Sequence, residues 1–104
     1  MTNESFALTE AVYYILLALY SPLHGYGIMQ MTEELSGGRV KLAAGTLYGA
    51  LNSMQKKGWI RELPGGKSSR KKEYVITDKG KDTAKAELER LRELVKNGEV
   101  MIGR

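Results

Sequence analysis

The first segment with helical spacing of apolar residues predicts a helix from about Glu10 to Tyr20. Thr9 is its candidate N-cap, and Ser21-Pro22 would end it. The apolar residues form two stripes, the first made of Leu8, Val12, Ile15, Leu16 and Leu19 and the second of Tyr13, Leu17 and Tyr20. A helix that is apolar on two sides needs a second partner in so small a chain, and a second copy of the chain is the simplest candidate. Which stripe would face that copy stays open.

A second predicted helix spans about Tyr26 to Leu35 and ends at Ser36-Gly37-Gly38, where glycine suits the left-handed conformation just past a helix end. Its buried side would consist of Ile28, Met31 or Thr32, and Leu35. The only histidine, His24, directly precedes this helix. We assign His24 to helix entry, because a metal site there would have carboxylates as its only further ligands.

A third amphipathic segment predicts a short helix from Gly45 to Lys57 that is stopped by Gly58. Leu47, Leu51 and Met54 recur at spacings of four and three and so share one buried face. The residues left on the outer surface are small, polar or cationic: Thr46, Tyr48, Gly49, Asn52, Gln55 and Lys56. Such side chains suit the major groove of DNA, where donors and acceptors on the base edges must be met. Tyr48 could instead pack its ring against the second helix and expose only its hydroxyl.

Two short runs of β-prone residues follow, Trp59 to Leu63 and Glu73 to Thr77. The loop between them opens with Pro64-Gly65-Gly66 and is rich in cations. Its length suits a wing-like hairpin better than a tight two-residue turn. Trp59 is predicted to pack in the core at the base of this wing.

Thr77 is a candidate cap for a final helix that starts at Asp78 and is predicted to end at Asn97-Gly98. Within this helix, spacings of four, three and four separate the apolar residues Ala84, Leu88, Leu91 and Val95. The residues between them are almost all charged, so the apolar seam is narrow and suits pairing with another helix. A helix packed on its own domain is the alternative, and we favour dimerisation.

The predicted order of elements is helix, helix, helix, strand, basic loop, strand and helix. This order is the plan of a winged helix-turn-helix domain, a mainly α fold with a small β-hairpin, here followed by a C-terminal dimerisation helix. Residues 1–77 are expected to form the winged DNA-binding domain, and residues 78–104 the dimerisation helix and tail, as one structural unit. The length of 104 residues allows one small domain.

The positive charge of the chain is concentrated in its middle. Residues 1–37 hold four Glu and no Lys or Arg, whereas residues 38–81 hold eleven Lys or Arg against three acidic residues, a net charge of +8. Residues 82–104 carry no net charge. Such a segment is expected of a surface that binds a polyanion such as nucleic acid. A solvated face with a lysine-rich edge strand would show the same pattern.

The residue inventory argues against catalysis, cofactors and metals. The chain has no Cys and one His, which removes disulfides, thiolate metal sites and Cys nucleophiles. The sequence shows no phosphate-binding glycine loop between a strand and a helix, so we expect no enzyme activity, no cofactor and no metal. The apolar run Val12–Leu19 is far shorter than the roughly 20 residues of a membrane span. We expect a cytoplasmic protein that does not bind membranes.

Over about residues 6–97, the chain resembles the PadR family of transcriptional regulators. The motifs that carry the resemblance are Tyr26, then Gly45-Thr46-Leu47-Tyr48 with Leu51, then Gly58-Trp59-Ile60, then Gly65-Gly66, Arg70, Lys72 and Tyr74, and finally Thr77 with Gly80. A single C-terminal helix is similar to the compact subgroup of this family. The chain departs from the family pattern at Ala43-Ala44, at Gly49 and at Glu73, and its last helix has no aromatic residue.

Two of these departures concern the start of the third helix. Ala43 offers no side-chain N-cap, which costs about 1 kcal/mol relative to Ser or Thr. Gly49 stands where the family often has Pro, which loosens the first turn. We therefore expect this helix to become firmly ordered only when it docks on DNA. The last helix, lacking aromatic residues, argues against a stacking drug pocket of the compact-subgroup kind.

The resemblance implies a homodimeric repressor that responds to a small-molecule effector and binds a pseudo-palindromic operator in double-stranded DNA. The third helix would enter the major groove, the wing would meet phosphates or the minor groove, and the first and last helices would form the dimer. The expected DNA-binding residues are Tyr26, Gly45, Thr46, Tyr48, Gly49, Asn52, Lys56, Lys67, Ser68, Ser69, Arg70, Lys71 and Lys72. The expected dimer interface consists of Leu8, Val12, Tyr13, Leu17, Ala84, Leu88, Leu91 and Val95. The alternative function is a winged-helix module that binds protein or RNA without operator specificity.

Overall fold

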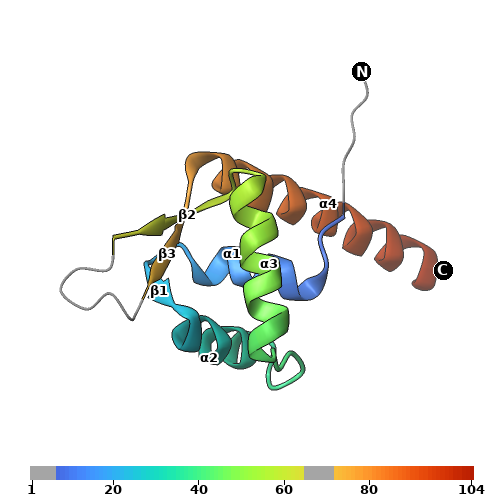
Figure 1. Cartoon of the computed structure of the whole chain (residues 1–104). Helices are drawn as coiled ribbons and strands as arrows, with labels where there is room; N and C mark the ends of the chain where they lie inside the picture. Colours follow the sequence, from blue (N-terminus) through green and yellow to red (C-terminus); the bar gives the residue numbers. More distant parts are fainter. Residues whose placement is uncertain (1–6, 65–71) are drawn as a thin grey trace.

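The computed structural model of the chain describes residues 7–64 and 72–104. Its elements, in order, are α1 (Glu10–Ala18), β1 (Leu23–His24), α2 (Gly25–Leu35), α3 (Ala44–Lys56), β2 (Ile60–Leu63), β3 (Glu73–Ile76) and α4 (Asp78–Ile102). Figure 1 shows α3 in front of α1, the sheet on the left, and α4 running from the end of β3 across to the far right. The fold is mainly helical with a small antiparallel sheet, as the sequence predicted.

Local hydrogen bonds fix the helix ends close to their predicted places. The hydroxyl of Thr9 accepts a hydrogen bond from the N–H of Val12 at 3.1 Å and so caps α1. His24 caps α2, because its Nδ1 accepts a hydrogen bond from the N–H of Gly27 at 3.2 Å. The predicted helix-entry role of His24 is therefore confirmed. Directly after α3, Gly58 has a φ of 80°, a conformation that side chains disfavour, which explains why this helix stops there.

The sheet contains one strand that the sequence analysis missed. The strands are ordered β1-β3-β2, and both pairs are antiparallel. Strand β1 is only Leu23 and His24, which pair with the first two residues of β3. Two residues are too few to show a strand periodicity, so this pairing is visible only in three dimensions. The N–H of Ile76 in β3 also donates to the carbonyl of Leu19 at 2.9 Å, which ties the sheet to the end of α1.

A single apolar core joins the helices to the sheet. Its buried side chains are Ile15, Leu16, Leu19, Ile28, Leu47, Leu51, Met54, Ile60, Tyr74, Ile76 and Ala84. Leu8, Val12 and Trp59 are half-buried and pack against this core, which agrees with the predicted place of Trp59. The first apolar stripe of α1 thus faces the interior of its own chain. The second stripe, with Tyr13 and Leu17, remains partly open to solvent.

The inner side of α2 differs from the prediction at its last turn. Thr32 is buried and its hydroxyl donates to the carbonyl of Met29 at 3.0 Å, so Thr32 rather than Met31 fills the disputed position. Leu35 is 44% exposed, contrary to the prediction. Ser36 is buried instead, and its hydroxyl accepts a hydrogen bond from the N–H of Val40 at 2.8 Å. The chain therefore turns inward just after Leu35 and leaves that side chain outside.

Helix α4 begins as predicted but continues past the predicted end at Asn97-Gly98. The hydroxyl of Thr77 accepts a hydrogen bond from the N–H of Gly80 at 3.0 Å and donates one to the carbonyl of Gly58 at 2.6 Å. Gly98 lies inside the helix. A glycine inside a helix costs only about 1 kcal/mol relative to Ala, so it does not have to end the helix. Among the helices of the described residues, none is long and apolar enough to cross a bilayer.

Candidate nucleic-acid interface

The third helix presents two chemically different sides. Leu47, Leu51 and Met54 are buried on its inner side, as predicted from their spacing. The predicted reading residues Gly45, Thr46, Tyr48, Gly49, Asn52 and Lys56 are all exposed. In Figure 1 the full length of α3 lies in the foreground and no other described element crosses in front of it. The fold therefore holds α3 by its apolar side and leaves its polar side free for a ligand.

The start of α3 is as weakly held as the sequence indicated. Ala43 takes the N-cap position and no side chain caps the helix there. Gly45 and Gly49 have open space where a Cβ would stand, so packing inside the chain does not require glycine at either place. Their missing side chains instead lower the outer surface of the helix, which permits close approach of a groove to the backbone.

Tyr48 is the residue that links α3 to α2. Its side chain lies against Gly25 in the first turn of α2, where an added Cβ would overlap the Tyr48 hydroxyl and come within 3.0 Å of its Cζ. Tyr48 is nevertheless 46% exposed. The end of its side chain, rather than an outward-facing hydroxyl, makes the contact with α2, and its contact with DNA stays a prediction. Burial, followed by the Glu62 carboxylate and Tyr48, raises the pKa of the neighbouring Tyr74. Tyr74 therefore stays neutral near pH 7.

A second tyrosine lies beside this contact. Tyr26 follows Gly25 directly and is 63% exposed. Its hydroxyl accepts a long hydrogen bond, 3.4 Å, from the side-chain amide of Gln30. Tyr26 belongs to the first turn of α2, and Tyr48 contacts that turn from α3. Tyrosine hydroxyls are among the groups that commonly contact DNA phosphates.

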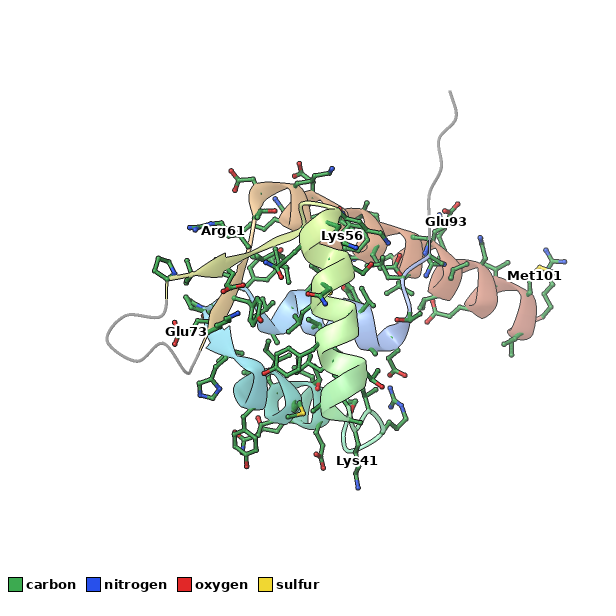
Figure 2. All side chains as sticks on the ribbon, viewed as in Figure 1. Lys41, Lys56, Arg61, Glu73, Glu93 and Met101 are labelled. Atoms are coloured by element: carbon green, nitrogen blue, oxygen red, sulfur yellow. The ribbon has the colours of Figure 1, made fainter. Side chains whose placement is uncertain are left out.

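Cations surround the reading helix. Figure 2 places Lys41 and Lys56 near opposite ends of α3 and Arg61 on the outer side of β2. Lys72, at the start of the strand after the wing loop, lies 3.7 Å from the Glu62 carboxylate, but this exposed pair is worth little in water. The predicted contacts Lys67, Ser68, Ser69, Arg70 and Lys71 lie outside the described residues. The described part of the interface is therefore α3, the start of α2 and the base of the wing.

Metal chemistry has no visible support in the described ranges. Within residues 7–64 and 72–104, no three His, Asp or Glu side chains come together in a way that could hold a metal ion. The lone histidine is already engaged as the cap of α2. The polar and cationic side chains on the exposed side of α3 suit contact with a polyanion.

Comparison with known proteins decides the family. The profile of the transcriptional regulator PadR-like family matches residues 14–86, which is most of the chain. The chain belongs to the PadR-like family. It is a transcriptional regulator with a DNA-binding winged-helix fold, and regulators of this family are not enzymes. The resemblance inferred from the Gly45–Tyr48 motif and the basic hairpin is confirmed.

Solved structures share this PadR-like fold. A PadR family transcription regulator from Clostridium difficile has a TM-score of 0.73 and 24% identity, with 92% of this chain and 100% of that chain covered. RosR from H. salinarum has a TM-score of 0.69 and 24% identity over 92% of this chain and 91% of that one. A transcriptional regulator from Clostridium thermocellum has a TM-score of 0.66 and 22% identity over 89% and 88%. At these identities the likeness concerns the fold alone.

One curated protein is similar in sequence. It is an uncharacterized 37.1 kDa protein in transposon Tn4556 of Streptomyces fradiae, 36% identical over 66 residues, or 64% of this chain. The matched region spans 18% of the length of that protein. This relative adds no activity or partner to the description of the PadR-like chain.

The residues predicted to form a dimer interface do not all reach the surface of this PadR-like chain. Ala84 is buried, at 3% exposure, and Leu8 and Val12 pack against the core of their own chain. Tyr13, Leu17 and Leu91 are half-buried. Leu88 and Val95 are exposed, the latter by 59%. The surface that could meet a partner is thus narrower on α1 than the sequence suggested.

On α4 the exposed apolar surface is longer than predicted. Leu94, Val100, Met101 and Ile102 are all exposed and were not among the predicted residues. The spacing of the seam continues past Val95 to Gly98 and Ile102, at three and four residues, which is the signal that could have found Ile102. Figure 2 shows Met101 at the free end of α4, away from the rest of the molecule.

A buried carboxylate at the α1–α4 contact escaped the sequence analysis. Glu87 is only 4% exposed, and the Arg90 guanidinium donates two hydrogen bonds to it, at 2.9 and 2.6 Å. These bonds from Arg90 lower the pKa of the Glu87 carboxyl, with a further contribution from the backbone N–H of Leu8. Burial and then the Glu87 carboxylate raise the pKa of Tyr13. Glu87 therefore stays charged and holds the segment before α1 against α4.

Proposed function

We propose that this PadR-like regulator is a homodimeric repressor, acting in the cytoplasm, that binds a pseudo-palindromic operator in double-stranded DNA. The observation that carries the proposal is α3, whose apolar side is buried and whose outer side is uniformly small, polar or cationic and uncovered by other described elements. An α-helix fits the major groove of B-DNA, and side chains such as Asn52 can pair with base edges there. Lys56 and Lys72 would neutralise phosphates beside it, with the predicted wing residues 67–71.

Exposed apolar side chains on α4 support the homodimer in this proposal. The distal half of α4 exposes Leu88, Leu94, Val95 and Ile102, and exposed apolar side chains that recur along one helix indicate a partner. Tyr13 and Leu17 of α1 offer partly exposed apolar surface beside it. We therefore narrow the proposed interface to Tyr13, Leu17, Leu88, Leu91 and Val95, and add Leu94 and Ile102. A dimer would present two copies of α3 related by a two-fold axis.

Repression and response to an effector follow from this arrangement as further parts of the proposal. A dimer that occupies an operator blocks access to the DNA by simple exclusion. A small molecule that changes the angle between two copies of α3 would change how well both fit their half-sites at once. Half-sites then lie about 34–36 Å apart, or a multiple of that.

The deciding experiment selects bound sequences from a random duplex pool with the full chain. We expect a two-fold symmetric site, and an affinity that falls steeply with salt because bound phosphates release counterions. Lys56→Gln should weaken binding to all duplexes and reduce the salt slope by about 1, whereas Asn52→Ala should relax the choice of base at one position in each half-site. Lys85→Gln, which removes the same charge from an exposed place on α4, is the matched control.

Several outcomes would contradict the proposal. A site without symmetry would exclude the dimeric reader, and equal affinity for all duplexes or stronger affinity for RNA would favour the alternative winged-helix module. Equal effects of Lys56→Gln and Lys85→Gln would show that only overall charge matters, which excludes α3 as the reading helix.

A further inference from the structure

A cavity of about 600 Å³ lies beside α3, between this helix, the segment that leads into α1 and the start of α4. Helix α3 contributes Ala50, Ser53, Met54 and Lys57, which recur at three, four and seven residues and form a stripe distinct from the reading residues Asn52 and Lys56. The walls are mostly apolar. Leu8, Val12, Met54 and Trp59 are among the apolar residues that line it.

Among the described residues, the only charged side chains that line the cavity are two lysines, Lys57 and Lys79. The Nζ of Lys57 lies 4.9 Å from the centre of the Trp59 ring. The side chain of Lys79 lies across Gly58, where its Nζ would be 3.9 Å from a Cβ added to that residue. Both ammonium groups are thus held at the Gly58–Trp59 end of the cavity. Among the ion pairs of residues 7–64 and 72–104, neither lysine has a carboxylate partner.

We infer that this cavity binds an apolar organic anion, with its carboxylate or sulfonate between Lys57 and Lys79 and its apolar body against Val12, Met54 and Trp59. The volume falls in the range of roughly 300–1,000 Å³ that is typical of small-molecule sites. Two like charges beside an apolar wall repel each other and attract a counter-charge, and a partly desolvated anion gains more from them than it would in water. A neutral or cationic ligand would leave this pair uncompensated.

Binding at this place would also act on DNA recognition, a consequence that rests on the proposed function. Lys57 follows Lys56 directly at the end of α3, so an anion there lowers the positive potential where a phosphate would bind. The ligand also touches the flank of α3 from Ala50 to Lys57. The anion should therefore weaken DNA binding, and by linkage DNA should weaken anion binding by the same factor.

The test uses two fluorescent probes that share the same rings. The first, 1-anilinonaphthalene-8-sulfonate, carries a sulfonate, and the second, N-phenyl-1-naphthylamine, is neutral. Trp59 is the only tryptophan in the chain and lines the cavity, so energy transfer from Trp59 detects a bound probe, and variants of the cavity then show where it binds. We expect saturable transfer to the anionic probe, one molecule per chain, and at least tenfold weaker binding of the neutral probe.

Variants separate this cavity from other apolar surfaces. Lys57→Gln with Lys79→Gln should weaken the anionic probe at least tenfold and leave the neutral probe unchanged. Lys85→Gln, a lysine of α4 outside the cavity, should have no effect. Ala50→Leu should fill the cavity and abolish energy transfer for both probes, with thermal melting curves showing that the variants remain folded.

Three results of these titrations would contradict the proposed anion site. Equal affinity of the two probes, or an unchanged affinity after loss of both lysines, would overturn the assignment of an anion site. Energy transfer that survives Ala50→Leu would place the probe elsewhere, for example on the exposed apolar side of α4. These titrations contain no DNA, so they stand even if the chain binds no operator. Where an operator has been selected, a saturating anionic probe that leaves duplex affinity unchanged would refute the link to DNA, and would show that Lys57 and Lys79 serve the ligand alone.

Discussion

The outer side of α3 and the distal half of α4 are both exposed, but they expose opposite kinds of side chain. On α3 the apolar residues are inside and the polar residues face solvent, whereas most apolar residues of α4 beyond Glu87 are exposed, Leu94 and Val95 among them. A polar surface on a supported helix is stable in water, so it can remain exposed when no ligand is bound. An apolar surface on a projecting helix is favourable only when another apolar surface covers it. This contrast supports the proposal that α3 binds DNA and that a second chain covers α4.

Breaking the α4 side should have the largest effect. Leu91→Glu places a carboxylate in the seam of each copy, which removes about 2 kcal/mol of apolar burial per copy and adds the cost of desolvating a charge. We expect the dimer to dissociate at least 100-fold more readily in sedimentation equilibrium. Val95→Glu should act in the same direction without disturbing the fold, because Val95 is largely exposed in the single chain.

The matched control for this prediction is Ala86→Glu, which introduces the same group at an exposed position on the side of α4 opposite Val95. It should leave the association constant within about threefold of the original. A wild-type chain that stays monomeric at the highest concentration measured, or a dimer that tolerates both seam variants, would show that α4 has another partner.

The contact between Tyr48 and Gly25 provides a test of how α3 is held against α2. Gly25→Ala should lower the free energy of unfolding by about 1 kcal/mol, because the added methyl group must displace the end of the half-exposed Tyr48 side chain. In a Tyr48→Ala background, which removes that hydroxyl, the same substitution should cost almost nothing. Urea unfolding of the four proteins gives this double-mutant cycle directly.

Gly49→Ala is the control for this cycle, since open space surrounds the added methyl group and alanine favours a helix by up to about 1 kcal/mol. It should stabilise the chain. A penalty for Gly25→Ala that persists without Tyr48 would mean that the backbone at Gly25, rather than the tyrosine, sets the cost. DNA affinity of Gly25→Ala should fall with the displaced tyrosine, while Gly49→Ala tests the close approach of the groove itself.

The smallest effect is expected at the uncapped start of α3. Ala43→Ser supplies the missing N-cap and should raise the free energy of unfolding by about 1 kcal/mol. Amide exchange at residues 45–49 should slow in the free chain, and bound duplex should then add less protection than it does in the original. Ala44→Ser, one residue inside the helix, cannot form that cap and serves as the control. Equal protection with and without duplex in the original chain would refute ordering on DNA.

Features set by neighbouring residues were predictable from the sequence. The caps Thr9, His24 and Thr77 act through hydrogen bonds to residues three positions away, and the buried face of α3 follows from a spacing of four and three. Such patterns need no knowledge of distant parts of the chain. This locality is why most helix boundaries and the buried face of α3 agree with expectation.

Features that depend on distant contacts were not predictable. Strand β1 exists only because β3 lies beside it, and Leu35 is exposed only because the chain turns inward at Ser36. The predicted end of α4 was wrong because glycine often ends a helix. The sequence around Gly98 does not show that α4 continues through this residue. Glu87 belongs to the same group, since its burial depends on the N-terminal segment and on Arg90.

The hydroxyl of Thr77 joins the two surfaces compared here. It donates to the carbonyl of Gly58 just after α3 and caps α4 at the same time, while Gly80 lies too close to the Trp59 carbonyl for any side chain. These contacts fix the angle between α3 and α4. In the proposed dimer, that angle determines the distance between the two copies of α3. The length of DNA that one dimer can span is then decided by a threonine hydroxyl and an absent methyl group, neither placed to touch the DNA.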